Sequence, residues 1–296
     1  MPENTGDPVR RGAARPRRVG LVLARASQVL GEEPYYHEFI EGLERVLAPA
    51  GVSVLVKVVT DWAAEVATYE RWSAQSGIDG VILVDLGPND ERVDLVASLG
   101  LPAVVLGDPS TAPSLSTVWT DDAGFAREAV RFLASLGHEV IGHVAGPLRF
   151  AHTQLRRGGL TREAEVLGMT LLTGEGDYSF ESGRLASHGL LAGSPVRPTA
   201  IVYDNDVMAL GGLAAVEQQG LGTPDDLSVI AWDDSALCQL AVPALTAMSH
   251  DVERIGELAA QALLDVVAGA PAGVYEAPSA HIVPRASTAA LSGGRG

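Results

Sequence analysis

Short polar side chains follow two apolar runs in the second half of the sequence. The run 199–203 precedes Asp-Asn-Asp, and the run 227–232 precedes Asp-Asp. We interpret both runs as neighbouring strands, and ligands of open α/β sheets bind beyond the carboxyl ends of the strands. Carboxylates and amides at that edge can exchange hydrogen bonds with the hydroxyl groups of a small molecule. The pattern therefore predicts a small-molecule cleft, with Asn205 and Asp233 as candidate contacts.

An arginine and several aromatic residues could complete such a cleft. Arg156 follows the sequence Ala-Gly-Pro at 145–147 and lies at the start of a predicted helix. Its guanidinium could fork onto vicinal hydroxyls or a carboxylate, although an exposed surface arginine is the plainer interpretation. Four aromatic residues could either stack on a flat or sugar-like ligand or belong to the core: Tyr35, Tyr36, Tyr178 and Trp232.

The polar residues also have a structural interpretation. Asn and Asp are favoured at the first position of a helix, because their side chains accept a hydrogen bond from a free backbone N–H. Asn205 or Asp206 could cap the predicted helix 207–219, and Asp233 could cap a helix as well. Capping and ligand binding can coexist. We expect Asp206 to act as the cap, while Asn205 and Asp233 face the ligand.

The usual motifs of catalysis, phosphate binding and metal binding are missing from the sequence. There is no G-x-x-x-x-G-K-[ST] loop and no G-x-S-x-G nucleophile elbow. His138 and His143 are one residue too far apart for the i, i+4 ligands of a zinc helix, and they enter a predicted strand. The single cysteine, Cys238, excludes an intramolecular disulfide and offers no cysteine cluster for a metal. We therefore expect no enzyme activity, no cofactor and no metal.

The composition is that of a globular protein with an excess of acidic residues. The 296 residues are 47% hydrophobic and 20% charged, and they carry a net charge of −16. Such a body repels phosphate backbones, which argues against nucleic-acid binding by the globular part. No apolar stretch approaches the ~18 residues that span a bilayer, and no signal-peptide pattern opens the sequence. We expect a cytoplasmic protein without membrane contact.

Seven apolar runs alternate with helical patterns after residue 18. The runs are continuously apolar, which is typical of strands buried on both faces of a parallel sheet. Strands and helices in alternation predict an α/β fold built from right-handed βαβ units. The predicted strands are 19–24, 52–59, 80–85, 103–107, 140–145, 199–203 and 227–232.

The alternation repeats once, so we predict two Rossmann-like lobes with parallel sheets and a ligand cleft between them. Residues 1–18 hold five arginines without apolar periodicity, and we interpret them as a disordered arm or linker remnant. We also expect a disordered tail at 291–296. The predicted N-terminal lobe comprises 19–136 plus 249–278, and the predicted C-terminal lobe comprises 137–248 plus 279–290.

Five segments of the sequence form an ordered series of motifs. The two longest are Asp-Asn-Asp-Val-Met-Ala-Leu-Gly at 204–211 and the segment 223–234, which ends in Trp-Asp-Asp. Shorter segments lie at 78–83, 136–148 and 243–246. The series resembles the lactose/galactose-repressor (LacI/GalR) family of transcription regulators, in which the two long segments read A-N-D-x-M-A-L-G and V-P-x-D-V-S-V-x-G-(F/Y)-D-D. The resemblance covers about residues 19–288.

This resemblance implies a fold like that of the type I periplasmic binding proteins, with a small effector bound between the lobes. The effector in this family is usually a sugar or a nucleobase-like molecule. The resemblance also implies a homodimer that contacts operator DNA through an N-terminal helix-turn-helix. By motif, the implied effector contacts are Arg156, Asn205, Asp233, Tyr178, Tyr35, Tyr36, Asp121 and Trp232.

The sequence departs from the family pattern in several places. Asp204 replaces the alanine of A-N-D. No segment resembles the helix-turn-helix, so we expect operator DNA to be bound only through a module that is missing here. The first loop, 25–34, is longer than usual, so we expect a distinctive side of the cleft. The charged and amide residues of this loop are Arg25, Gln28, Glu32 and Glu33.

Two other classes of function stay open at this point. A solute-binding protein for sugar uptake would have the same fold, and the missing signal peptide argues against it. A sugar-processing enzyme with an α/β core would need a catalytic dyad or a metal in the cleft, and the motifs above supply neither. We therefore expect the effector-sensing domain of a transcription regulator.

Overall fold

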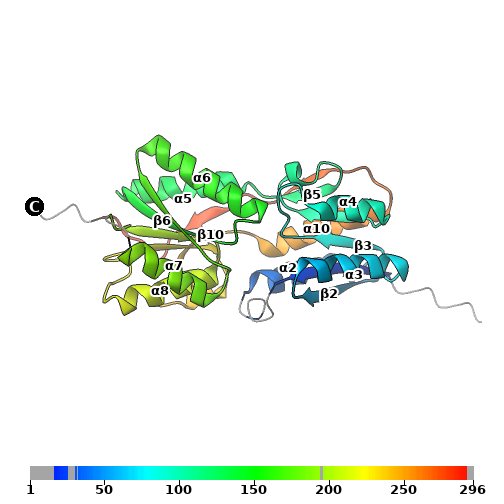
Figure 1. The fold of residues 1–296 in the computed structure, drawn as a ribbon, viewed down its shortest axis with the longest axis horizontal. Helices are drawn as coiled ribbons and strands as arrows, with labels where there is room; N and C mark the ends of the chain where they lie inside the picture. The colour runs from blue at the N-terminus through cyan, green and yellow to red at the C-terminus, as the bar shows by residue number, and fades with distance from the viewer. Residues whose placement is uncertain (1–16, 26–30, 32, 194–195, 292–296) are drawn as a thin grey trace, which may run out of the picture.

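The computed structural model describes residues 17–25, 31, 33–193 and 196–291, which form two α/β lobes lying end to end (Figure 1). Each lobe is built on a six-stranded sheet. The strand order is β11-β5-β4-β3-β1-β2 in the first lobe and β12-β10-β9-β8-β6-β7 in the second. The two orders correspond strand by strand, which confirms the predicted fold class of two lobes with mostly parallel sheets.

All strand pairs of the first lobe are parallel. Its strands are β1 (Arg17–Ala24), β2 (Val52–Val59), β3 (Gly80–Leu83), β4 (Ala103–Leu106), β5 (Ser116–Trp119) and β11 (Val274–Glu276). Its helices are α2 (Tyr35–Leu47), α3 (Trp62–Ala74), α4 (Glu91–Ser98), the short 3-10 helix η1 (Pro109–Thr111) and α10 (Val252–Val267).

The second lobe is also parallel, except that β12 runs antiparallel to β10. Its strands are β6 (Val140–Ala145), β7 (Thr170–Glu175), β8 (Ala200–Tyr203), β9 (Ser228–Asp233), β10 (Thr246–Ser249) and β12 (His281–Val283). Its helices are α5 (Asp122–Ser135), α6 (Ala151–Leu167), α7 (Phe180–Ala192), α8 (Asp206–Gln218) and α9 (Ala236–Leu240).

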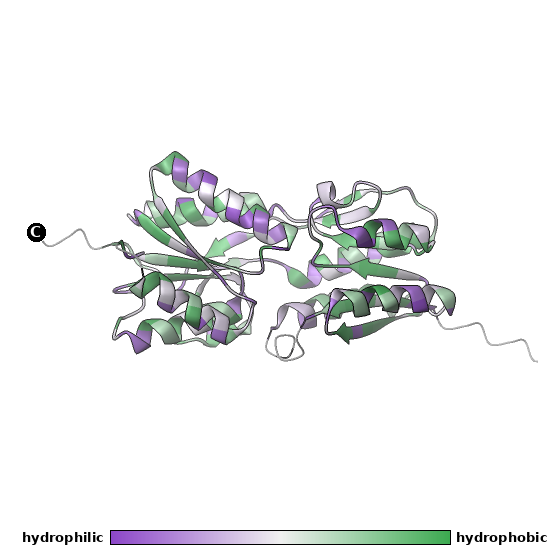
Figure 2. Ribbon diagram, viewed as in Figure 1, coloured by the Kyte–Doolittle hydropathy of each residue, from purple (hydrophilic) through white to green (hydrophobic). Residues whose placement is uncertain are grey.

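Each sheet is buried on both faces, which explains why the strands read as continuous apolar runs. In β1, Leu21 belongs to the core cluster formed with α2 and α10, whereas Val22 belongs to the cluster formed with α3 and α4. In β8, Ile201 and Val202 likewise belong to two different core clusters of the second lobe. Figure 2 shows the inner strands of both sheets as mainly hydrophobic.

Within the described residues, the chain crosses between the lobes after β5, after β10 and after β11. The first crossing corrects the predicted lobe boundary at residue 136. Helix α5 packs against α6 of the second lobe, and its residues Phe125, Ala129 and Leu133 share a core cluster with Ile141 and Leu160. The boundary therefore lies between β5 and α5, because α5 buries its apolar face on the second sheet.

The ends of the chain differ slightly from the prediction. Strand β1 begins at Arg17, which pairs with Val52 of β2, so the strand includes two residues that we assigned to the arm. The remaining arm residues 1–16 and the tail residues 292–296 lie outside the described residues, as do Gln28 and Glu32. No helix among the described residues is long and apolar enough to cross a membrane.

Candidate functional site

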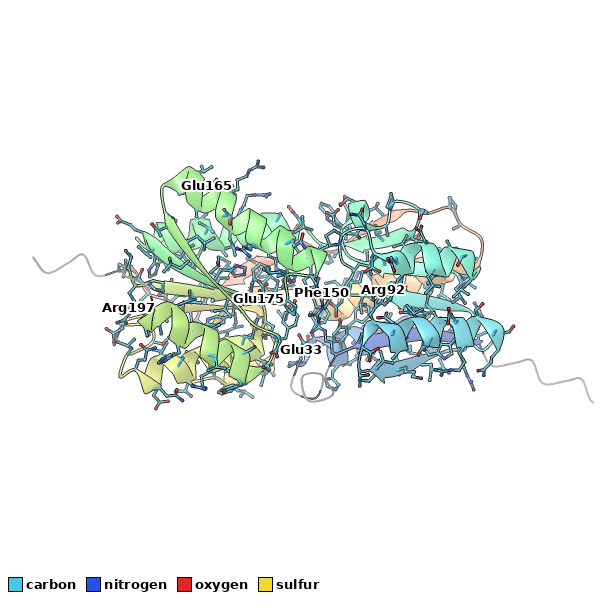
Figure 3. The ribbon with its side chains drawn as sticks, viewed as in Figure 1. Glu33, Arg92, Phe150, Glu165, Glu175 and Arg197 are labelled. Atoms are coloured by element: carbon cyan, nitrogen blue, oxygen red, sulfur yellow. The ribbon has the colours of Figure 1, made fainter. Side chains whose placement is uncertain are left out.

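A cavity of about 70 Å³ lies between the lobes, where the carboxyl ends of the two sheets face each other. We call it the inner cavity. Figure 3 shows Glu33 in this region between the lobes. The first lobe contributes Arg25, Glu33, Tyr35, Tyr36, Val84, Asp85, Leu106 and Gly107, and the first crossing contributes Thr120. The second lobe contributes Asp122, His152, Arg156, Tyr178, Asp204 and Asp233.

Arg156 is held in the inner cavity by contacts on three sides. Its Nε donates to Oδ1 of Asp122 at 2.7 Å, and its Nη1 donates to the carbonyl oxygen of Asp204 at 3.0 Å. The guanidinium lies 4.5 Å from the ring centroid of Trp232. Burial alone would lower the pKa of Arg156, but the neighbouring carboxylates of Asp122 and Asp204 raise it. Arg156 is therefore charged and fixed in orientation.

The carboxyl group of Asp233 forms no hydrogen bond or salt bridge with a described residue, although the charge of nearby Arg156 favours its ionised form and acts to lower its pKa. It ends β9 with a left-handed backbone (φ 77°), a conformation that Asp adopts more readily than most residues. Burial raises the pKa of Asp233 well above its ordinary value, and the nearby Asp206 adds to this shift. Because the group faces the cavity, a ligand hydroxyl could satisfy it.

Three tyrosines line the inner cavity, as the sequence predicted for aromatic residues of a cleft. The hydroxyl of Tyr178 lies 2.8 Å from Nε2 of His152 and 3.2 Å from Oγ1 of Thr153. The ring centroids of Tyr35 and Tyr36 lie 5.3 Å apart in an edge-to-face arrangement. The rings supply apolar faces beside the polar groups of Arg156 and Asp233.

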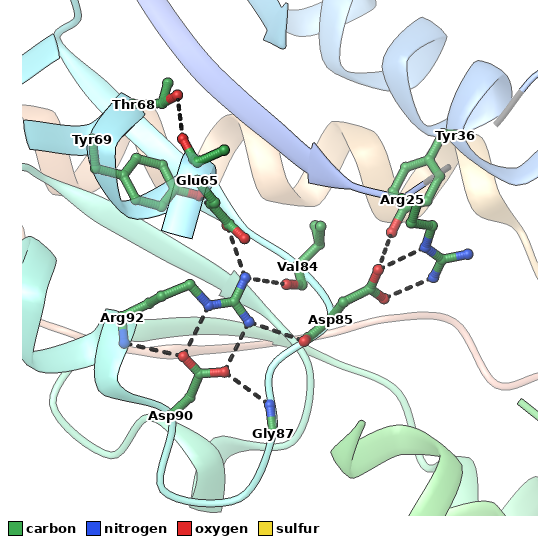
Figure 4. A network of polar contacts seen from close by, with 11 residues as sticks. Arg25, Tyr36, Glu65, Thr68, Tyr69, Val84, Asp85, Gly87, Asp90 and Arg92 are labelled. Carbon is green, nitrogen blue, oxygen red and sulfur yellow. Dashed lines mark hydrogen bonds and ion pairs between the residues drawn. The ribbon is translucent and has the colours of Figure 1, made fainter. Parts of the chain in front are cut away.

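Arg25 contacts both lobes beside the inner cavity, and Figure 4 shows its pairing with Asp85 of the first lobe. Its Nε and Nη2 donate to the two carboxylate oxygens of Asp85 at 2.8 and 2.9 Å, and its Nη1 donates to Glu33 at 2.7 Å. Its guanidinium also lies 4.5 Å from the ring centroid of Tyr178 in the second lobe. Burial would raise the pKa of Asp85, but the paired Arg25 lowers it to about 2. In the sequence, the charged residues of the long first loop pointed to this cluster of ion pairs around Arg25.

Asn205 does not line the inner cavity, although the sequence predicted it as a ligand contact. Its Oδ1 accepts the backbone N–H of Met208 at 2.9 Å, so Asn205 caps α8. Its Nδ2 donates to the carbonyl oxygen of Tyr178 at 3.0 Å. The prediction that Asp206 caps this helix is therefore wrong. Asp206 is the first residue of α8, and its buried carboxylate accepts the backbone N–H of Ser235 at 2.9 Å.

Asp121 and Trp232 also lie outside the cavity lining. Asp121 caps α5 by accepting the backbone N–H of Gly124 at 2.8 Å, and the next residue, Asp122, faces the cavity instead. Trp232 is fully buried in the core of the second lobe beneath Arg156. Both residues support the site from behind rather than facing the cavity.

Asp204 also lines the inner cavity. In the sequence it stood out only as a departure from the family pattern. Its Oδ1 lies 2.9 Å from Nε2 of His143, and its Oδ2 accepts the backbone N–H of Gly146 at 2.9 Å. Burial would raise the pKa of Asp204, but His143, Arg156 and these hydrogen bonds lower it. No sequence pattern identified the lining residues Thr120, Asp122 and His152 as candidate ligand contacts.

No group of three or more His, Cys, Asp or Glu residues suited to a metal occurs in the part of the chain that the structure describes. His138 lies 2.9 Å from Oγ1 of Thr199, while His143 faces Asp204, so the two histidines have separate partners. Cys238 is buried, and burial strongly raises the pKa of its thiol. The side chains around the inner cavity are therefore suited to hydrogen bonding and stacking.

Comparisons of the sequence place the chain among known regulators. A family profile described as a periplasmic binding protein-like domain matches residues 130–288, more than half of the chain. The HTH-type transcriptional repressor CytR of Escherichia coli (strain K12) is 31% identical over 264 residues, which cover 88% of this chain and 77% of that protein. The HTH-type transcriptional regulator MalR of Streptomyces coelicolor is 30% identical, covering 90% of this chain and 80% of MalR.

Solved structures agree with these relatives. A LacI family transcriptional regulator from Bifidobacterium animalis subsp. lactis is 36% identical and superposes with a TM-score of 0.85, covering 93% of this chain and 99% of that one. The complex of the transcriptional regulator CelR with cellobiose is 26% identical, with a TM-score of 0.84 and coverage of 93% and 86%. The chain therefore belongs to the LacI family of transcriptional regulators.

Proposed function

We propose that the inner cavity binds a saccharide or a related polyol and that this effector regulates transcription. The observation that carries the proposal is the convergence of Arg156 and Asp233 from the second lobe with Tyr35 from the first around one cavity. A guanidinium, a free carboxyl group and an aromatic ring are the groups that recognise vicinal hydroxyls and a sugar face. The cellobiose complex of the related CelR supports a sugar as the class of ligand.

The charges around the inner cavity favour a neutral effector over an anionic one. Arg25 is already paired with Asp85 and Glu33, and Arg156 is paired with Asp122. A phosphate or carboxylate on the effector would therefore meet no unpaired cation among the lining residues. Hydroxyl groups can instead donate to the carboxylates and accept from the arginines. A phosphate or carboxylate group at the inner cavity is therefore disfavoured.

We infer that the effector acts by stabilising one relative arrangement of the lobes. A ligand shifts such an equilibrium only by the difference in its affinity for the two arrangements. The contact of Arg25 with Tyr178 joins the lobes in this structure, and the backbone N–H of Ala151 donates to the carbonyl of Leu86 at 2.8 Å. We propose that DNA is bound in the cytoplasm by a module other than these acidic lobes.

The regulator is proposed to act as a homodimer. Strand β2 is an edge strand of its sheet, and its residues Leu55, Val56 and Val58 are exposed. Exposed apolar residues on an edge strand are a common basis for association. Sedimentation equilibrium should give twice the chain mass of 30.8 kDa, whereas a single-chain mass at micromolar concentration would contradict the dimer.

Thermal unfolding with a panel of ligands tests the proposed function. A ligand at a hundred times its Kd stabilises the folded chain by roughly 2.7 kcal/mol. We expect at least one neutral monosaccharide, disaccharide or polyol to raise the Tm, while the matching sugar phosphates leave it unchanged. The absence of any shift with sugars, polyols, nucleosides and purines would overturn the proposal.

A further inference from the structure

A second and larger cavity lies beside the inner one. It has a volume of about 410 Å³ and is lined by the ends of β1, β2 and β3 together with Arg149 and Phe150 of the second lobe. We call it the outer cavity. Val84 and Asp85 line both cavities, so the two spaces adjoin at these residues.

The two cavities differ in the size of the ligand that they can accommodate. Pockets for small ligands are typically about 300–1,000 Å³. In this arrangement of the lobes the inner cavity has only about 70 Å³, so a saccharide unit there requires the lobes to move apart. The outer cavity, at about 410 Å³, already falls within the range. A saccharide that reaches Arg156 and Asp233 therefore extends most readily toward the outer cavity.

The wall of the outer cavity carries groups that suit a sugar ring. Trp62, the first residue of α3, is 48% exposed, and no other described ring or cation covers its indole. Arg149 is exposed and forms no ion pair with the described residues, and its guanidinium lies 4.4 Å from the ring centroid of Phe150. An open indole face can pack on the C–H face of a sugar, and a free guanidinium can donate to its hydroxyls.

Asp85 is held firmly at the boundary between the cavities. Its backbone is left-handed (φ 56°), and its carbonyl oxygen accepts from Nη2 of Arg92 at 2.9 Å. Arg92 is itself fixed by Glu65 at 2.8 Å and by both carboxylate oxygens of Asp90 (Figure 4). The carboxylate of Asp85 thus lies at the boundary of both cavities, where ligand hydroxyls can replace the hydrogen bonds that Arg25 now donates to it.

We propose that the outer cavity is a second saccharide subsite and that the effector is an oligosaccharide of at least two units. One unit lies against Arg156 and Asp233, the next lies against Trp62, and Asp85 accepts hydroxyls at their junction. Arg25 releases Asp85 when the ligand binds, because its guanidinium now occupies both carboxylate oxygens. This inference rests on the proposed function, since it assigns the rest of the same effector.

Calorimetric titration with matched sugars tests the subsite. The probes are glucose, galactose and xylose, each paired with disaccharides that contain it: cellobiose, maltose, lactose and xylobiose. We expect one disaccharide to bind at least tenfold more tightly than its constituent monosaccharide. Trp62→Ala should remove that advantage while leaving the monosaccharide affinity unchanged. The control is Val166→Ala, which removes an apolar residue that is 72% exposed on α6 and should change neither affinity.

The outcomes separate this inference from the proposed function. A monosaccharide that binds as tightly as every disaccharide containing it, in both the unmodified chain and Trp62→Ala, would overturn the second subsite and leave the sensor function standing. Equal loss of monosaccharide and disaccharide affinity in Trp62→Ala would also overturn it. Binding of no sugar at all would overturn the proposed function and this inference together.

Discussion

Asp233 and Asp234 show how two adjacent aspartates acquire different roles. Both have left-handed backbones, with φ of 77° and 62°. Asp234 lies 2.6 Å from Nη1 of Arg285, so its charge is compensated within the second lobe. Asp233 lines the inner cavity and forms no hydrogen bond or salt bridge with a described residue. We therefore propose Asp233, rather than Asp234, as the ligand contact.

Asp206 should make the stability of the chain depend on pH. Burial raises the pKa of Asp206 from 3.8 to about 6, although hydrogen bonds from Ser235 and Cys238 favour its ionised form. Because folding favours the protonated form, ionisation of Asp206 destabilises the folded chain above about pH 6. The free energy of unfolding rises again as the pH falls from about 6 toward 4. The difference of about two between the folded and unfolded pKa of Asp206 corresponds to roughly 3 kcal/mol.

The variant Asp206→Asn should remove this gain on acidification. Asn keeps an acceptor for the backbone N–H of Ser235 and cannot ionise. Urea unfolding at pH 7.5 and pH 4.5 measures the free energy of unfolding of the variant and of the unmodified chain. Asp121→Asn is the control, because Asn can also cap α5. The same pH dependence in all three proteins would contradict this role for Asp206.

At the scale of the element, the start of α8 depends on Asn205. Its side chain caps the helix and also satisfies the carbonyl oxygen of Tyr178. Loss of a cap costs about 1 kcal/mol, and an unsatisfied buried acceptor costs about 1–3 kcal/mol. Asn205→Ala should therefore lower the free energy of unfolding by about 2–4 kcal/mol. Asn205→Ser, which keeps the cap, should lose less, and an equal loss in both variants would contradict the capping role.

The sequence locates the two polar strand ends but not which residue of each faces the cavity. At 204–206 the middle residue caps the helix, and the cavity is lined by Asp204, the residue before it. At the start of α5 the cap is Asp121, and the cavity is lined by Asp122, the residue after it. Consecutive polar residues have the same local propensity for capping. The choice between them depends on backbone torsions that the tertiary structure sets.

Helix α5 shows a similar limit for whole elements. Its apolar periodicity correctly predicts a helix with a buried face, but periodicity does not say which sheet that face covers. The packing of Phe125 and Leu133 on the second lobe could not be predicted from a local pattern. The strands were easier to predict, because burial on both faces leaves a continuous apolar run in each of them.

At the scale of the molecule, two sheets with corresponding strand orders face each other across the inner cavity. The strand–helix alternation was sufficient to predict this architecture. The pairing of Arg25 with Asp85 was not predictable, because the two residues are 60 positions apart and meet only when the first lobe has folded. The extra length of the first loop pointed only to the region in which such a contact forms.

The most direct test of the account is a calorimetric titration that compares two glycine variants. Glycine adopts the left-handed backbone of Asp233 and Asp234 without strain. With the sugar that raises the Tm most, Asp233→Gly should weaken binding about tenfold. Removing the carboxyl group leaves a buried ligand hydroxyl without a partner, which costs about 1–3 kcal/mol, and about 1.4 kcal/mol corresponds to a factor of ten. Asp234→Gly should bind as the unmodified chain does. Equal affinity in all three proteins would contradict the claim that the inner cavity recognises the effector through Asp233.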